Sequence, residues 1–160
     1  MTYLFRIQNE TGQDMDNIIS FIDEYYPYAK EKIPFDQPVT IRLVSDESNA
    51  ADDLGKTGYY DPAARCIVVY VDNRHPKDIM RSINHELVHH AQNCRGEFDE
   101  ETTERTGEQG YVLNDEKLRN LEKEAYEGQL IFREFEDLRK RSLQEKRNEN
   151  LYETLKKEIL

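Results

Sequence analysis

The sequence predicts an α+β fold, with a small, mainly antiparallel sheet packed on an HExxH helix and on a long second helix. Two runs rich in β-branched residues, Val39–Val44 and Cys66–Val71, predict strands. Apolar residues recur at helical spacing in Asp16–Lys30 and again from Asp115 to about Lys146. Hydrophobic residues make up 37% of the 160-residue chain, which is enough for one modest core.

The shorter elements are predicted from local signals. Thr2–Ile7 is expected to be a first short strand, Ser45–Lys56 a polar loop and Gly58–Pro62 a turn. Pro76 suits the first position of a helix, and Gly96 suits the position just after its end. The helix that carries HExxH should therefore lie between these two residues.

The C-terminal part of the chain is strongly charged. Glu97–Asn114 is acidic and shows no period, so it is expected to be a long loop before the second helix. Leu151, Leu155 and Ile159 predict a further amphipathic helical segment. We expect residues 1–138 to form one domain built around the HExxH helix, and residues 139–160 a charged helical extension that could bind a protein partner.

Composition excludes several classes of function. The net charge of −11 repels phosphate backbones, so nucleic-acid binding is not expected. No stretch approaches the roughly 20 apolar residues of a membrane span, and Met1–Asn9 lacks the apolar centre of a signal peptide. Cys66 and Cys94 are expected to be free thiols, since neither belongs to a CxxC pair. These observations favour a cytoplasmic protein without a membrane partner.

His85, Glu86 and His89 form the HExxH segment, which is the strongest functional signal in the chain. On a helix, His85 and His89 lie about 40° apart in projection and about 6 Å apart along the axis, so both imidazoles can bind one Zn²⁺ ion. Glu86 points about 100° from His85, where its carboxylate can act as general base on a zinc-activated water. An apolar face lies on the opposite side of the helix, at about 160–300° from His85, and it separates a core side from a metal side. It is formed by Met80, Ile83, Leu87, Val88 and Ala91.

A third metal ligand must come from outside this segment. Gln92 and Arg95 occupy the positions that are glycine and histidine in the metzincin pattern, which excludes that pattern. His90 points about 100° from His89, so it is expected to flank the helix rather than to bind metal. The long second helix offers Glu122 and Glu124, which point about 200° apart, and the residues alone leave both open.

The segments HELVHHAQ, at 85–92, and EKEAYEGQ, at 122–129, resemble the gluzincin class of zinc metallopeptidases. That class carries HExxH on one helix and a glutamate ligand on a second, often within Glu-x-x-Ala-Asp or Glu-x-x-Ala-Asn. The resemblance implies Glu122 as the third ligand, although Tyr126 stands where those groups have Asp or Asn. In size the chain is similar to minigluzincin domains and to uncharacterised HExxH proteins of tailed phages.

This resemblance implies an endopeptidase that hydrolyses peptide bonds in a peptide or protein substrate. It also implies that Cys66–Val71, the strand before the HExxH helix, forms the edge of the cleft and pairs with an extended substrate. His75, Tyr111 and Tyr126 are candidate oxyanion donors, each with an alternative structural role. The alternative function is a zinc-stabilised binding, structural or regulatory protein with little proteolytic activity.

Overall fold

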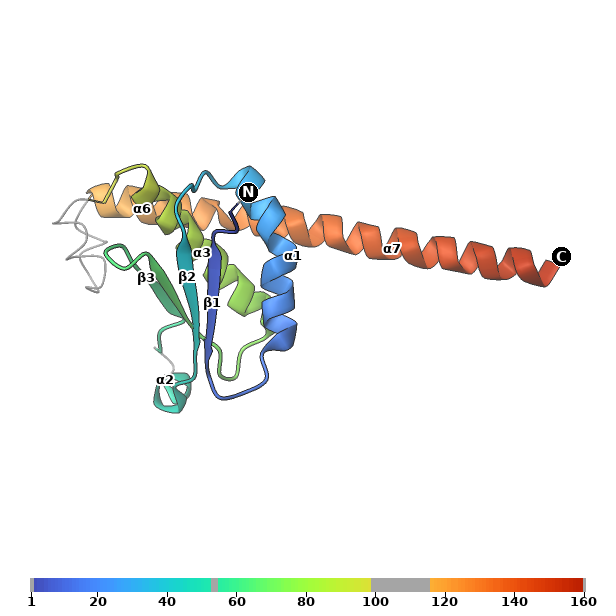
Figure 1. Cartoon of the computed structure of the whole chain (residues 1–160), viewed down its shortest axis with the longest axis horizontal. Coiled ribbons are helices and arrows are strands. Elements are labelled where there is room, and N and C mark those ends of the chain that lie inside the picture. Colours follow the sequence, from blue (N-terminus) through green and yellow to red (C-terminus); the bar gives the residue numbers. More distant parts are fainter. Residues whose placement is uncertain (1, 53–54, 99–115, 160) are drawn as a thin grey trace.

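The fold is α+β, as predicted: helices pack against one face of a four-stranded sheet (Figure 1). The computed structural model describes residues 2–52, 55–98 and 116–159. Alternate side chains of Val39–Val44 are buried, whereas the first four residues of Cys66–Tyr70 are all buried, as expected for a central strand covered on both faces. The strands are β1 (Phe5–Glu10), β2 (Val39–Val44), β3 (Gly58–Asp61) and β4 (Cys66–Tyr70).

The sheet is mixed, and the prediction that it is mainly antiparallel is wrong. Its strand order is β1-β2-β4-β3, and β1 pairs with β2, and β2 with β4, in parallel. Only β3 and β4 are antiparallel. Helix α1 (Asp16–Lys32) connects β1 to β2 and returns the chain to the end where β1 began, so the two strands run in the same direction.

The edge strand next to the HExxH helix is β3, not the strand at 66–71. We predicted a turn at Gly58–Pro62, but Gly58–Asp61 is a strand and the turn follows it. Because β4 has β2 on one side and β3 on the other, its backbone cannot accept an extended substrate. In the turn, Asp61 Oδ1 accepts hydrogen bonds from the backbone N–H groups of Ala63 and Ala64.

Helix α3 (Pro76–Cys94) agrees with the predicted HExxH helix. His75 caps its N-terminus, since its Nδ1 accepts from the Lys77 backbone N–H at 3.1 Å. One face of α3 enters the core against the sheet through Ile79, Met80, Ile83 and Leu87, all almost fully buried. Apolar burial thus fixes which way the remaining faces of α3 point.

The predicted second helix is interrupted. Helix α6 (Glu116–Glu127) ends one residue before α7 (Gln129–Ile159), which also contains the segment predicted as a separate C-terminal helix. The break falls at Gly128, whose carbonyl accepts from Asn84 Nδ2 on α3 at 2.9 Å. Asn84 Oδ1 in turn accepts from Tyr25 on α1 at 2.5 Å. One buried amide therefore holds α1, α3 and the α6–α7 junction together.

The first turns of α7 belong to the core and the rest projects from it (Figure 1). Phe132 and Phe135 pack on Tyr25 of α1, whereas every described side chain of 140–158 is exposed. A short helix, α2 (Glu47–Ala51), lies in the segment predicted as a loop and is capped by Asp46. Within the described residues, no helix combines the length and apolar character that crossing a membrane requires.

Candidate metal centre and cleft

Helix α3 presents two polar stripes beside its apolar face. His85, His89 and Gln92 lie within about 60° of one another in projection, and Glu86 begins a second stripe about 100° from His85. His90 continues that second stripe about 40° from Glu86. The first stripe faces α6, and the second faces β3, as the contacts below show.

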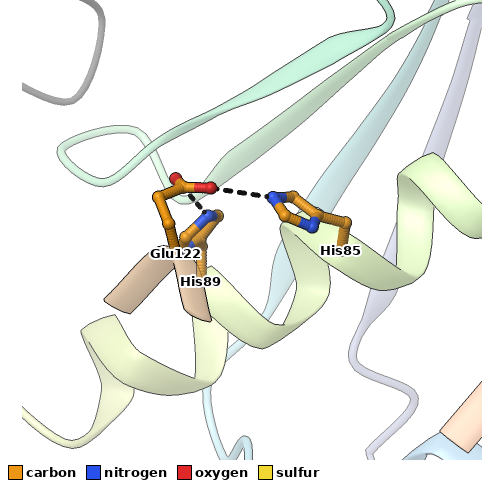
Figure 2. Close-up of side chains that lie close together, drawn as sticks. All are labelled: His85, His89 and Glu122. Atoms are coloured by element: carbon orange, nitrogen blue, oxygen red, sulfur yellow. Dashed lines mark hydrogen bonds and ion pairs between the residues drawn. The ribbon is translucent and has the colours of Figure 1, made fainter. Parts of the chain in front are cut away.

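The carboxylate of Glu122, on α6, lies between the two histidines of the first stripe (Figure 2). Its Oε1 is 2.9 Å from His89 Nε2, and its Oε2 is 3.2 Å from His85 Nε2. Burial opposes the ionisation of Glu122, but hydrogen bonds from the two histidines outweigh burial and lower its pKa. The side chain is thus held as a carboxylate, the form in which it can bind a metal ion.

The three donor atoms fit a zinc ion. One ligand atom from each of His85, His89 and Glu122 lies within 4.8 Å of the other two. Two imidazoles and a carboxylate are a typical catalytic zinc set, and tetrahedral bonds of about 2.0–2.1 Å separate ligand atoms by roughly 3.3 Å. The two histidine–glutamate separations, 2.9 and 3.2 Å, are close to that value, and no two ligand atoms of the group lie more than 4.8 Å apart, so limited side-chain movement would suffice. Glu124 has no part in this group.

Gln92 forms a hydrogen bond with the other ring nitrogen of His89, a role that we did not predict from the sequence. Its Oε1 lies 2.8 Å from His89 Nδ1 and accepts the Nδ1 proton, so Nε2 is the nitrogen that could bind a metal ion once it gives up the proton that it donates to Glu122. Gln92 Nε2 donates to the Leu121 carbonyl at 2.9 Å and to Glu124 Oε1 at 3.0 Å. Glu124 also binds Arg95 at 2.6 Å, so it lies behind the histidine rather than at the metal position.

Glu86 is a buried carboxyl group beside the metal ligands. Only 9% of the residue is exposed, and burial raises its pKa, with partial offset from His89 and His85. It nevertheless lines the cleft that contains His85, His89 and Glu122. A carboxylate of raised pKa at the wall of a cleft is suited to accept and return a proton.

The cleft has a volume of about 550 Å³ and lies between α3, α6 and the edge strand β3. Thr57 and Gly58 line it at the start of β3, and Arg74, Arg81 and Ser82 line it at and before the N-terminal half of α3. Aromatic side chains line the rest: Tyr59, Tyr60, Phe98 and Tyr126.

The structure distinguishes the three residues that were predicted as oxyanion donors. The Tyr126 ring packs edge-on against His85 with centroids 4.8 Å apart, so it stays a candidate oxyanion donor. His75 caps α3 and does not line the cleft. Tyr111 lies outside the described residues. His90 is fully buried instead of flanking the helix, and Cys66 and Cys94 are free thiols as predicted.

Comparisons with protein-family models, curated proteins and solved structures give no match. The gluzincin resemblance and the function that it implies therefore stay predictions, and the argument for function depends on the geometry of the cleft.

Proposed function

We propose that this protein is a zinc-dependent endopeptidase in which His85, His89 and Glu122 hold the metal. The observation that carries the proposal is the convergence of Glu122, from a separate helix, on both histidines of HExxH. The two histidines follow from local helix geometry, but the glutamate is 33 residues beyond His89 and has no local reason to meet them. Because Gln92 accepts the Nδ1 proton of His89, the Nε2 atom directed at Glu122 is the one that would exchange its proton for a metal ion.

Zinc bound by these side chains would polarise a peptide carbonyl and lower the pKa of water beside it. Glu86 would take the proton from the attacking water and deliver it to the leaving nitrogen. Its buried position keeps bulk water from competing for that proton, while its place in the cleft wall leaves it within reach of a substrate. Tyr126 is the described side chain best placed to donate to the developing oxyanion.

The edge strand β3 supports an extended peptide as the substrate. The Thr57 carbonyl accepts from the Tyr70 backbone N–H at 3.1 Å, which fixes the alternation of the β3–β4 pair. By that alternation the N–H and C=O groups of Gly58 and Tyr60 point away from β4, toward the free edge. Because Gly58 and Tyr60 both line the cleft, a peptide strand could pair with them.

The test uses fluorescein-labelled casein as a general unfolded substrate, with protein loaded with one equivalent of zinc. The wild type should cleave casein, and a chelator should stop it. Glu86→Gln should keep zinc but lose at least about 100-fold in rate, because an amide cannot accept the proton. His85→Ala should lose zinc and the thermal stabilisation that zinc gives. Cleavage by Glu86→Gln at the wild-type rate would contradict the assigned role.

The second candidate is a zinc-stabilised binding or regulatory protein. The observation in its favour is the projecting part of α7, which exposes Leu151, Tyr152 and Leu155. A protein that binds zinc through the same three ligands but cleaves no casein and no peptide library would support this candidate over the peptidase.

A further inference from the structure

The second polar stripe of α3 continues past Glu86 to residues that hold the edge strand. Tyr60, on β3, places its hydroxyl 2.7 Å from His90 Nδ1 and 2.9 Å from Asn93 Nδ2. Asn93 also donates to the carbonyl of Pro62 at 3.0 Å, in the turn that follows β3. Two residues of α3 therefore hold both the strand and its turn.

The direction of each hydrogen bond in this network is determined. The Gln37 carbonyl, 2.8 Å from His90 Nε2, can only accept, so Nε2 carries the proton and Nδ1 does not. Tyr60 therefore donates to Nδ1, and its oxygen accepts from Asn93. Cys94 Sγ also lies 3.6 Å from the same Nε2, and as a weak acceptor it leaves the shorter bond to the Gln37 carbonyl as the stronger one. One arrangement of protons therefore satisfies the hydrogen bonds among the Gln37 carbonyl, His90, Tyr60 and Asn93. Since His90 and Tyr60 are also buried, this network is rigid.

Strand β3 has little other than these side-chain hydrogen bonds to fix its position. Because β3 has four residues and pairs with β4 alone, one ladder of hydrogen bonds is all that holds its backbone within the sheet. The side chain of Tyr60 points to α3 while its backbone N–H and C=O point to the free edge. The residue that is tied to the helix is thus also one that a peptide would pair with.

We propose that His90 and Asn93 are positioning residues, which hold Tyr60 so that the free edge of β3 lies at a fixed distance from the metal ligands. The proposal rests on the proposed function. Glu86, His90 and Asn93 project from α3 within about 60° of one another. One rigid helix would therefore carry the metal ligands, the general base and the anchor of the substrate-binding strand, and would set their spacing.

Tyr60→Phe tests this with little change of shape, since it removes only the hydroxyl. Steady-state cleavage of fluorescein-labelled casein should show KM raised by at least roughly five- to tenfold, because the hydroxyl makes two hydrogen bonds and both are lost. The value of kcat and the zinc affinity should stay within about twofold, because the strand binds substrate without touching the metal. The control is Tyr26→Phe, which removes a hydroxyl that accepts from the Leu4 N–H far from the cleft.

Two substitutions of His90 separate anchoring from burial. Asn places an oxygen near the position of Nδ1, so His90→Asn keeps the acceptor for Tyr60 and loses the donor to Gln37. His90→Gln places its amide near Nε2 and does the reverse. We expect KM close to the wild-type value for His90→Asn and a rise like that of Tyr60→Phe for His90→Gln. Equal KM for both variants would overturn the proposal.

Hydrogen exchange of the peptide covering residues 57–61 gives a readout that does not depend on cleavage. Exchange should be faster in Tyr60→Phe than in the wild type and unchanged in Tyr26→Phe. If the wild type cleaves no casein, the proposed function fails, while the exchange result still decides whether the network anchors β3. Unchanged exchange in Tyr60→Phe would overturn the proposal. If the wild type cleaves casein, a KM of Tyr60→Phe equal to the wild-type KM would overturn it as well.

Discussion

Replacing Gln92 with alanine tests whether the residue behind His89 tunes the metal site. The side chain is fully buried and makes three hydrogen bonds: one from His89 Nδ1, one to the Leu121 carbonyl and one to Glu124. Alanine removes all three. His89 then loses the partner that fixes both its proton position and the orientation of its ring.

The expected losses of zinc affinity and of stability in Gln92→Ala follow from these contacts. Loss of a partner behind a metal-binding histidine costs roughly 10–100-fold in metal affinity, or about 1.4–2.7 kcal/mol. The free energy of unfolding without zinc should fall as well, by about 1.5–4.5 kcal/mol for three hydrogen bonds. Two separate losses are therefore predicted, one in zinc affinity and one in stability.

Asn84→Ala is the matched control. Asn84 is also a fully buried amide, which ties α3 to α1 through Tyr25 and to the α6–α7 junction through Gly128, but its side chain hydrogen-bonds to none of the proposed metal ligands. Its loss should reduce stability by about 1–3 kcal/mol and change zinc affinity less than threefold. Zinc affinity is measured by competition with a fluorescent chelator, and stability by urea unfolding of the zinc-free protein. Equal zinc affinities for Gln92→Ala and Asn84→Ala would refute the reasoning.

Three further predictions follow from single positions. Glu122→Ala should weaken zinc binding at least 10–100-fold, whereas Glu124→Ala should leave it nearly unchanged, and chelator competition that gave the reverse ranking would transfer the ligand to Glu124. Gly128→Ala should destabilise the fold by roughly 1–3 kcal/mol in urea unfolding, since its Cβ would lie 2.7 Å from Val88 Cγ2. Burial raises the pKa of the Cys66 thiol, so its alkylation by iodoacetamide should be slow at pH 8 and still accelerate above pH 9, while fast alkylation at pH 8 would contradict its buried position.

Local sequence patterns predicted the elements that depend on local interactions. The helix at Pro76–Cys94 and the strand at Val39–Val44 have the predicted positions, because apolar period and end signals lie within the segments themselves. The same helical period placed His85 and His89 on one face. The α+β class followed from these elements without knowledge of how they pack.

Features that depend on contacts between distant residues could not be predicted from local sequence patterns. The parallel pairing of β1, β2 and β4 depends on how α1 and the later strands return the chain, and no residue within a strand encodes it. The strand character of Gly58–Asp61 arises from pairing with β4, which outweighed the turn signal of its glycine and of Pro62. Missing this strand led to the wrong choice of edge strand.

In the candidate site, too, the features set by local geometry were predicted and those set by packing between helices were not. The residues alone left Glu122 and Glu124 open, because both lie on a helix whose rotation against α3 was unknown. Packing gives them different surroundings: the first stripe of α3 meets Glu122, while Gln92 and Arg95 hydrogen-bond to Glu124. A signal for Gln92 was present, since it stands three residues after His89 on the same stripe. A polar residue at that position of a predicted metal-binding helix is therefore worth considering as a ligand support.

The central claim is a zinc ion held by two helices, and anomalous scattering from a crystal of the zinc-loaded protein tests it most directly. Data on either side of the zinc edge should give one strong peak per chain, bonded to His85 Nε2, His89 Nε2 and the Glu122 carboxylate, with no fourth protein ligand. Such an open position is what a catalytic zinc site requires. No peak at these side chains, or a peak closed by a fourth protein ligand, would contradict the account.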